Sequence, residues 1–181
     1  MKHSKKFWSA MGLIALAGIL GFFVIGGSGS TPVDADIPFN AYAPKQPIDY
    51  SHKLHAGDLN IDCQYCHTFA RRSRSAGIPS VEQCMACHSM IAVDKDPIKT
   101  LAKAYDDKQP IEWVKVHDLP DFVYFNHKRH VQHFECQECH GPVETMEVLY
   151  RQAPLTMGWC VNCHQDNRDK GASLDCLTCH K

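Results

Sequence analysis

Cysteine and histidine recur in one fixed pattern along this chain of 181 residues. The string C-x-x-C-H occurs five times, and its copies together use all ten cysteines. Two thiols at this spacing can each add across one vinyl group of a porphyrin, and the histidine that follows then lies under the iron as an axial ligand. The copies are CQYCH at 63–67, CMACH at 84–88, CQECH at 136–140, CVNCH at 160–164 and CLTCH at 176–180.

The pattern predicts five covalently bound c-type haems, at sites numbered 1 to 5 in chain order. Zinc knuckles and redox disulfides also use C-x-x-C pairs, but neither explains a histidine after every pair. A four-cysteine zinc site also needs such pairs in even number. The predicted attachment residues are Cys63, Cys66, Cys84, Cys87, Cys136, Cys139, Cys160, Cys163, Cys176 and Cys179. The predicted proximal ligands are His67, His88, His140, His164 and His180.

Each low-spin haem iron needs a second axial ligand opposite the proximal histidine. Two segments upstream of haem sites, YSHKLH at 50–55 and FNHKRH at 125–130, share the pattern aromatic-x-His-Lys-x-His. This internal repeat indicates a duplicated haem-packing module. Histidines three residues apart on a helical turn can point at two different haems. The predicted distal ligands in these segments are His52, His55, His127 and His130.

Further distal candidates lie outside the repeat. His117 stands alone in VHDLPDF, and Met157 lies three residues before Cys160. A thioether ligand would raise the reduction potential of its haem, whereas core packing is the commoner use of methionine. His133 lies three residues before Cys136, which is close for reaching round its own porphyrin. His3 lies at the N-terminal end, out of reach of any haem. The distal ligand of site 5 therefore stays open between Met157, His117 and His133.

The N-terminal region predicts a membrane anchor. Residues 7–27 carry no charge, and about 20 apolar residues are needed to span a bilayer. Three lysines precede this span, so the positive-inside rule leaves residues 1–6 in the cytoplasm and the haem domain on the outer, periplasmic face. An uncleaved single-pass anchor in the inner membrane is favoured over a cleaved signal, because the apolar stretch is long and no A-x-A box stands at the right place.

The rest of the chain divides at the long gap between sites 2 and 3. We expect an extended linker at 28–47, a dihaem lobe at 48–95, a connector at 96–116 with a short helix at 98–105, and a trihaem lobe at 117–181. Because five porphyrins would supply much of the buried apolar surface, the predicted fold is mostly irregular, with short α-helices and almost no sheet.

Charge argues against one class of function. Three of the 19 basic side chains precede the anchor, which leaves 16 basic against 20 acidic ones, before any haem propionates are counted. Nucleic-acid binding needs a basic surface and is disfavoured. Arg71, Arg72 and Arg74 form the one dense basic cluster outside the anchor, and could pair with propionates, dock an acidic partner or lie in a solvated loop.

The trihaem lobe resembles the small cytochromes c7 and c3, through FNHKRH, CQECH, MGWCVNCH and CLTCH. The resemblance implies that the first histidine of the repeat ligates the haem of the next C-x-x-C-H and the second ligates the following one. The family has a histidine just before its middle motif where this chain has Thr156 and Met157, which makes Met157 a candidate opposite His180. The implied pairs are His52 with His67, His55 with His88, His127 with His140, and His130 with His164.

Over most of its length the chain also resembles the pentahaem subunit of alternative complex III. The strings that carry this resemblance are the basic start and single apolar span, PIDYSHKLHAG, AGIPSVEQCMACH, VHDLPDFVYFNHKRHV, CHGPVETMEV and LTMGWCVNCH. It implies a membrane complex that oxidises quinol and passes electrons outward. The implied partners are iron–sulfur and integral membrane subunits, with a monohaem cytochrome c or a terminal oxidase as acceptor.

Three functions compete. An electron wire without substrate chemistry of its own fits a chain with enough ligands to fill both axial positions of five irons. A multihaem reductase would need an open iron position, which these ligands do not demand. A stand-alone membrane-anchored quinol dehydrogenase shares the anchor and the exported haems but normally has four haem sites. Purification separates these functions, because a wire alone has no turnover.

Overall fold

The computed structural model describes residues 37–38 and 40–181, and residues 40–181 belong to one compact unit. The predicted anchor at 7–27 and half of the predicted linker at 28–47 lie outside the described residues. Within the described part of the chain, no helix is long and apolar enough to cross a membrane.

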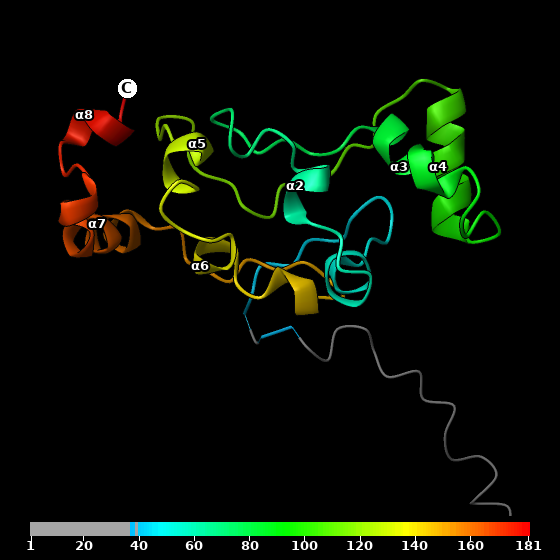
Figure 1. Ribbon diagram of the computed structural model, residues 1–181, viewed down its shortest axis with the longest axis horizontal. Coiled ribbons are helices and arrows are strands. Elements are labelled where there is room, and N and C mark those ends of the chain that lie inside the picture. Colours follow the sequence, from blue (N-terminus) through cyan, green and yellow to red (C-terminus); the bar gives the residue numbers. More distant parts are fainter. Residues whose placement is uncertain (1–36, 39) are drawn as a thin grey trace, which may run out of the picture. The chain divides into compact units, whose positions relative to one another are not determined.

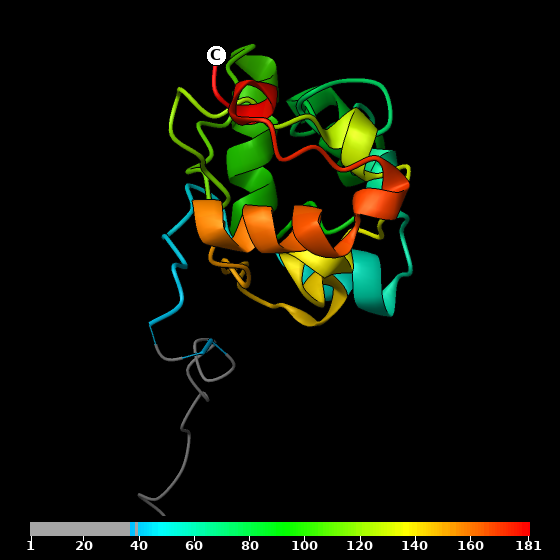
Figure 2. The same cartoon turned by 90° about the vertical axis from the view of Figure 1, so that its left-hand side faces the viewer.

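Short helices joined by irregular chain make up this unit (Figure 1; Figure 2). The α-helices are α2 (Cys63–Cys66), α3 (Val81–His88), α4 (Asp96–Asp106), α5 (His127–His130), α6 (Gln137–His140), α7 (Met157–Asp166) and α8 (Cys176–Cys179). One π-helical segment, η2 (Lys53–Asp58), and two 3₁₀ turns, η3 (Val143–Thr145) and η4 (Arg168–Lys170), complete them. Strand-like pairing in residues 40–181 amounts to one antiparallel bridge between Val123 and His180. The prediction of a mostly irregular fold with short helices is confirmed.

Side-chain caps start three of the helices that carry haem motifs. Asp62 accepts a hydrogen bond from the amide of Gln64 at 2.7 Å, and Asp175 accepts one from Leu177 at 2.8 Å. In these two cases an aspartate stands immediately before the first cysteine, and in the third the side chain of Thr156 accepts a hydrogen bond from the amide of Trp159 at 3.3 Å. Such N-caps satisfy amides that have no partner in the first turn. A four-residue helix has little stability of its own, so the cap helps to hold the two cysteines on one turn.

The apolar core of the polypeptide is small. Ile48, Val81 and Leu101 form its buried cluster, where α3 packs on α4. The helix predicted at 98–105 is present as α4, which begins two residues earlier because Pro97 is tolerated in a first turn. Elsewhere large apolar side chains lie exposed, such as Met90 at 80%. A core of this size agrees with the expectation that porphyrin rings supply much of the apolar surface.

The two copies of the repeat each bind the chain that follows a haem motif of the other half. The amide of Lys53 donates to the carbonyl of Met146 at 2.9 Å, and the amide of Lys128 donates to that of Ser73 at 3.0 Å. Around the first of these bonds η2 packs against η3. The two halves therefore hold each other at sites 1 and 3. The domain boundaries drawn from the sequence stay predictions.

Candidate haem sites

Three pairs of histidine rings face each other at the separation that an iron ion between them requires. An imidazole nitrogen binds a metal at about 2.0–2.1 Å, which places two opposed ring centroids roughly 6 Å apart. The observed centroid separations are 6.0 Å for His55 and His88, 6.3 Å for His127 and His140, and 6.1 Å for His130 and His164. The residues at sites 2, 3 and 4 therefore fit a haem iron with two histidine ligands.

Hydrogen bonds orient most of these rings. Where Nδ1 donates to a backbone carbonyl, the imidazole holds its proton there and leaves Nε2 free for a metal. His67, His88 and His164 of the haem motifs bond in this way to Gly77 at 2.7 Å, Ile91 at 3.1 Å and Ser173 at 2.6 Å. His55, His127 and His130 of the repeat bond to Ser51, Arg74 and Asn126, each at 2.8 Å.

The fourth histidine of the repeat, His52, lies near site 1. Burial is the main cause that lowers its pKa to about 4, and the neighbouring His67 lowers it further. Its Nδ1 is buried and has no hydrogen-bond partner in the part of the chain that the structure describes. A buried neutral imidazole next to His67 is suited to binding the iron at site 1.

The remaining candidates are not brought to one place. His117 packs against His140, with ring centroids 4.3 Å apart, and not against His180. His133 is exposed, and its ring lies 6.5 Å from that of Phe134. Met157 begins α7 and is 70% exposed. The ring of Phe122 stacks on His180, with centroids 5.8 Å apart. The distal ligand of site 5 stays a prediction.

An aromatic ring supports the histidines of each repeat copy. Tyr50 stacks on His55 at 4.6 Å and meets His52 edge-on at 4.9 Å. Phe125 stacks on His130 at 4.2 Å and meets His127 edge-on at 4.9 Å. The aromatic residue that begins each repeat copy therefore sets the direction of both histidines. The sequence pattern contained this residue, but not its role.

Thiols of neighbouring sites lie close together. Burial is the first cause that raises the pKa of each of four thiols, and a cysteine of the next site adds to it. The pairs are Cys66 with Cys87, Cys63 with Cys136, Cys139 with Cys163, and Cys160 with Cys179. The sites therefore follow one another in space in the order 2, 1, 3, 4, 5. The helices α3, α2, α6, α7 and α8 follow the same course in Figure 1.

The arginine cluster holds the two halves together. Arg71 donates to Gln64 Oε1 at 2.8 Å and to the carbonyl of Val131 at 3.1 Å. The guanidinium of Arg74 lies over the ring of Tyr124, 4.6 Å from its centroid, and its carbonyl receives the Nδ1 proton of His127. Sequence reasoning missed this function, because nothing in RRSRS reveals which distant backbone it will meet.

Comparison with protein families agrees with this geometry. The family described as "Cytochrome c7 and related cytochrome c" matches residues 123–181, and the "Class III cytochrome C family" matches residues 32–121. The chain is a multihaem cytochrome c. Its relationship to c7 and class III cytochromes extends through both halves, and it implies covalently bound c-type haem.

One curated relative of the cytochrome is the protein named "Menaquinone reductase, multiheme cytochrome c subunit" from Nitratidesulfovibrio vulgaris (strain Hildenborough). The two are 28% identical over 171 residues, which covers 80% of this chain and 81% of the relative. The similarity therefore extends well beyond the haem motifs.

Proposed function

We propose that this cytochrome is the electron-transfer subunit of a membrane complex that oxidises quinol, and that it carries electrons through five covalently bound haems. The observation that carries the proposal is the spatial order of the sites. Neighbouring thiols link site 2 to 1, 1 to 3, 3 to 4 and 4 to 5, with no site left aside. Such an order gives electrons one continuous path with an end at site 2 and an end at site 5.

Residues of the chain would perform three tasks along this path. Bound haem supplies one-electron redox chemistry, tuned by its axial ligands and its surroundings. The cysteines fix each porphyrin edge to a short helix. The paired histidines of sites 2, 3 and 4 would hold the iron from both sides, which would exclude substrate from it and supports electron transfer over a reductase activity. Met157 is the proposed distal ligand of the iron at site 5, opposite His180. A thioether there would give this haem a higher reduction potential than its neighbours.

The proposed setting is the outer face of the inner membrane. The uncharged span at 7–27, preceded by three lysines, would anchor the cytochrome as a single-pass protein. The proposed partners are iron–sulfur and integral membrane subunits of the complex, with a monohaem cytochrome c or a terminal oxidase as acceptor. The resemblance to the pentahaem subunit of alternative complex III supports this assignment.

The direction of electron flow has a second candidate. The relative from Nitratidesulfovibrio vulgaris is named as a subunit of a menaquinone reductase, which delivers electrons to a quinone. A wire of histidine-ligated haems conducts either way, because the direction depends on the potentials of donor and acceptor. Quinol oxidation is the primary proposal, and quinone reduction by the same subunit is the alternative.

Fast electron exchange within the isolated holoprotein tests the wire. A radiolytic pulse would place one electron on the oxidised protein, and haem absorbance would follow its redistribution. We expect exchange faster than about 10³ s⁻¹, the upper end of common enzyme turnover rates, so that the subunit does not limit a complex. Electrons that stayed in two separate haem pools would contradict a continuous path.

Purification through an affinity tag on this chain tests the complex and the direction. Detergent-solubilised membranes should yield the cytochrome together with iron–sulfur and membrane subunits. The purified complex should reduce a soluble cytochrome c with a menaquinol analogue, and the isolated subunit should not. A complex that only reduced the quinone would support the alternative direction. Quinol oxidation by the isolated subunit would favour a stand-alone dehydrogenase instead.

A further inference from the structure

The proximal histidines of sites 3 and 5 lack the orienting hydrogen bond that the other three make within residues 40–181. His67, His88 and His164 each donate a ring proton to a backbone carbonyl. Across residues 40–181, no such bond forms from the ring of His140. Something else must therefore hold this imidazole, whose plane lies within 6° of the plane of His127 opposite.

His117 occupies the position from which it can do so. Its ring meets that of His140 edge to face, with an interplanar angle of 79° and centroids 4.3 Å apart. Edge-to-face packing is a favoured arrangement of aromatic rings and resists rotation of either one. The separation is too short for an iron ion between the two rings, which needs roughly 6 Å. His117 therefore contacts the side of the ligand and does not share its metal.

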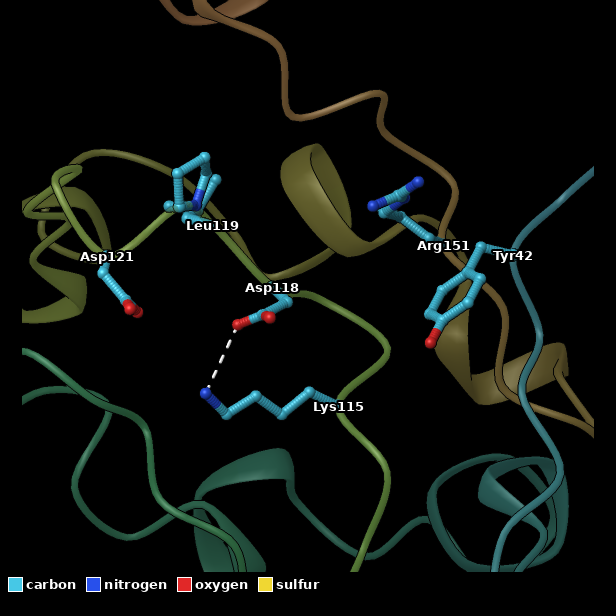
Figure 3. A pocket seen from close by; sticks show the side chains of 7 residues that line it. Tyr42, Lys115, Asp118, Leu119, Asp121 and Arg151 are labelled. Atoms are coloured by element: carbon cyan, nitrogen blue, oxygen red, sulfur yellow. Dashed lines mark hydrogen bonds and ion pairs between the residues drawn. The ribbon is translucent and has the colours of Figure 1, made fainter.

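His117 lies next to a buried residue. Val116, which precedes it, is 5% exposed. Lys115 and Asp118 pair at 3.3 Å across His117 and line an open pocket of about 430 Å³ with Tyr42 and Arg151 (Figure 3). The Nε2 atom of His117 is buried and finds no hydrogen-bond partner among the residues described.

We propose that His117 is a positioning residue that keeps the imidazole plane of His140 parallel to that of His127 at site 3. The inference rests on the proposed ligation of site 3 by these two histidines. The angle between axial imidazole planes matters because each ring raises the energy of the iron d orbital that its π system meets. Two parallel rings act on the same one of the two iron d orbitals that can interact with them, so the energies of these two orbitals are strongly separated. Crossed planes act on both orbitals and leave them close in energy.

This orbital separation is visible by electron paramagnetic resonance. A ferric low-spin haem with parallel axial planes gives a rhombic signal with three moderate g values. Crossed planes give a signal dominated by one large g value. Site 3 should therefore be rhombic in the oxidised holoprotein, and this signal should depend on the ring at position 117.

The experiment compares His117→Ala and His117→Phe with the wild-type holoprotein. Phenylalanine retains an edge-to-face ring without any nitrogen, whereas alanine removes the ring. Tyr105→Ala is the control, because it also removes an aromatic ring and Tyr105 is exposed on α4. A haem-to-protein ratio equal to that of the wild type first establishes that each variant has folded and been loaded.

We expect His117→Ala to move the site 3 signal towards a larger maximum g value while all haems stay low-spin. His117→Phe and Tyr105→Ala should leave it in place. An unchanged signal in His117→Ala would overturn the inference, as would a new high-spin haem, which would make His117 an iron ligand. If the alanine variant fails to load, a shifted signal in His117→Phe would overturn ring packing as the cause, and an unshifted one would support it.

This design keeps the inference separate from the proposed function. The spectra require no partner and no electron transfer, so a failed quinol assay would leave them interpretable. A wild-type protein without a rhombic low-spin signal would contradict the proposed ligation of site 3 itself. A wild-type signal that the alanine variant shares would contradict only the role of His117.

Discussion

Phe125 stacks on His130 with ring centroids 4.2 Å apart and planes 26° apart, and Tyr50 stacks on His55 in nearly the same geometry. The two aromatic residues begin the two copies of one repeat, and each also meets its nearer histidine edge-on. In both copies the second histidine donates its Nδ1 proton to the backbone carbonyl four residues earlier: His55 to Ser51, and His130 to Asn126. The module was therefore duplicated with its supporting contacts.

The first copy has a tyrosine, Tyr50, where the second has a phenylalanine. Its hydroxyl should make the free energy of unfolding of the protein fall at alkaline pH. Burial is the main cause that raises the pKa of Tyr50 from 10.0 to about 12. The fold therefore favours the neutral phenol, so this stabilisation is complete below pH 10 and is lost as the pH rises towards 12. Because the side chain is partly exposed, we expect a loss of about 1 kcal/mol.

Tyr50→Phe should keep the ring stacking and remove this alkaline loss. Urea denaturation at pH 9 and at pH 11.5 would measure the free energy of unfolding of both proteins. Tyr105→Phe, on the exposed side of α4, is the control and should follow the wild type. Parallel losses in the wild type and in Tyr50→Phe would show that the hydroxyl has no such effect.

The angles between paired histidine rings predict different spectra for sites 2 and 3. The rings of His55 and His88 cross at 66°, whereas those of His127 and His140 are within 6° of parallel. Site 2 should therefore give a larger maximum g value than sites 3 and 4 in the oxidised protein, and site 3 a rhombic signal. His55→Ala should abolish the first signal and His127→Ala the second, each with the gain of one high-spin haem.

Tyr105→Ala, which removes an exposed ring on α4, should change neither signal. The assignment of distal ligands would be wrong if His55→Ala removed the rhombic signal, or if either variant kept all its haems low-spin. Magnetic circular dichroism of the same samples would count the high-spin haems independently.

Local chemistry is what the sequence predicted well. The five haem motifs lie on short helices, and aspartates immediately before two of them cap their first turns. The spacing of the two H-x-x-H strings, with the family resemblance, led to the same three ring pairs that lie about 6 Å apart. These features depend on residues only a few positions apart or on a recurring module.

Long-range packing is what the sequence did not predict. The bond from His127 to the carbonyl of Arg74 spans 53 residues, and a carbonyl acceptor leaves no trace in residue types. The spatial order of sites 2, 1, 3, 4 and 5 departs from chain order because the repeat copies exchange contacts across sites 1 and 3. The contact of His117 with His140 has the same origin, since a lone histidine has no periodic signal.

Gly57 should be required where η2 packs against η3. A β-carbon at this position would collide with the carbonyl oxygen of Glu144, a backbone atom that cannot rotate away. Gly57→Ala should therefore lower the free energy of unfolding by about 1–3 kcal/mol, as overpacking commonly does. Since His55 lies on the same segment, its ligation of the iron at site 2 should weaken as well.

Gly158→Ala is the matched control, because a β-carbon there meets nothing within 4 Å. Alanine favours a helix over glycine by about 0.5–1 kcal/mol, so this variant should be as stable as the wild type or slightly more so. Urea denaturation of both variants and a haem-to-protein ratio would measure the difference. Equal stability of the two variants would mean that η2 shifts freely away from η3.

One substitution at site 5 distinguishes between the remaining candidates for its distal ligand. If Met157 binds the iron opposite His180, Met157→Ala should convert one haem in five to high-spin and lower the highest reduction potential, because a thioether ligand raises the potential. Magnetic circular dichroism and a spectroscopic redox titration would measure both. Met90→Ala is the control, since that side chain is 80% exposed and follows the histidine of site 2. Unchanged spectra and potentials in Met157→Ala would assign the methionine to packing, and His133→Ala would then be the variant to compare, because His117 already lies against His140.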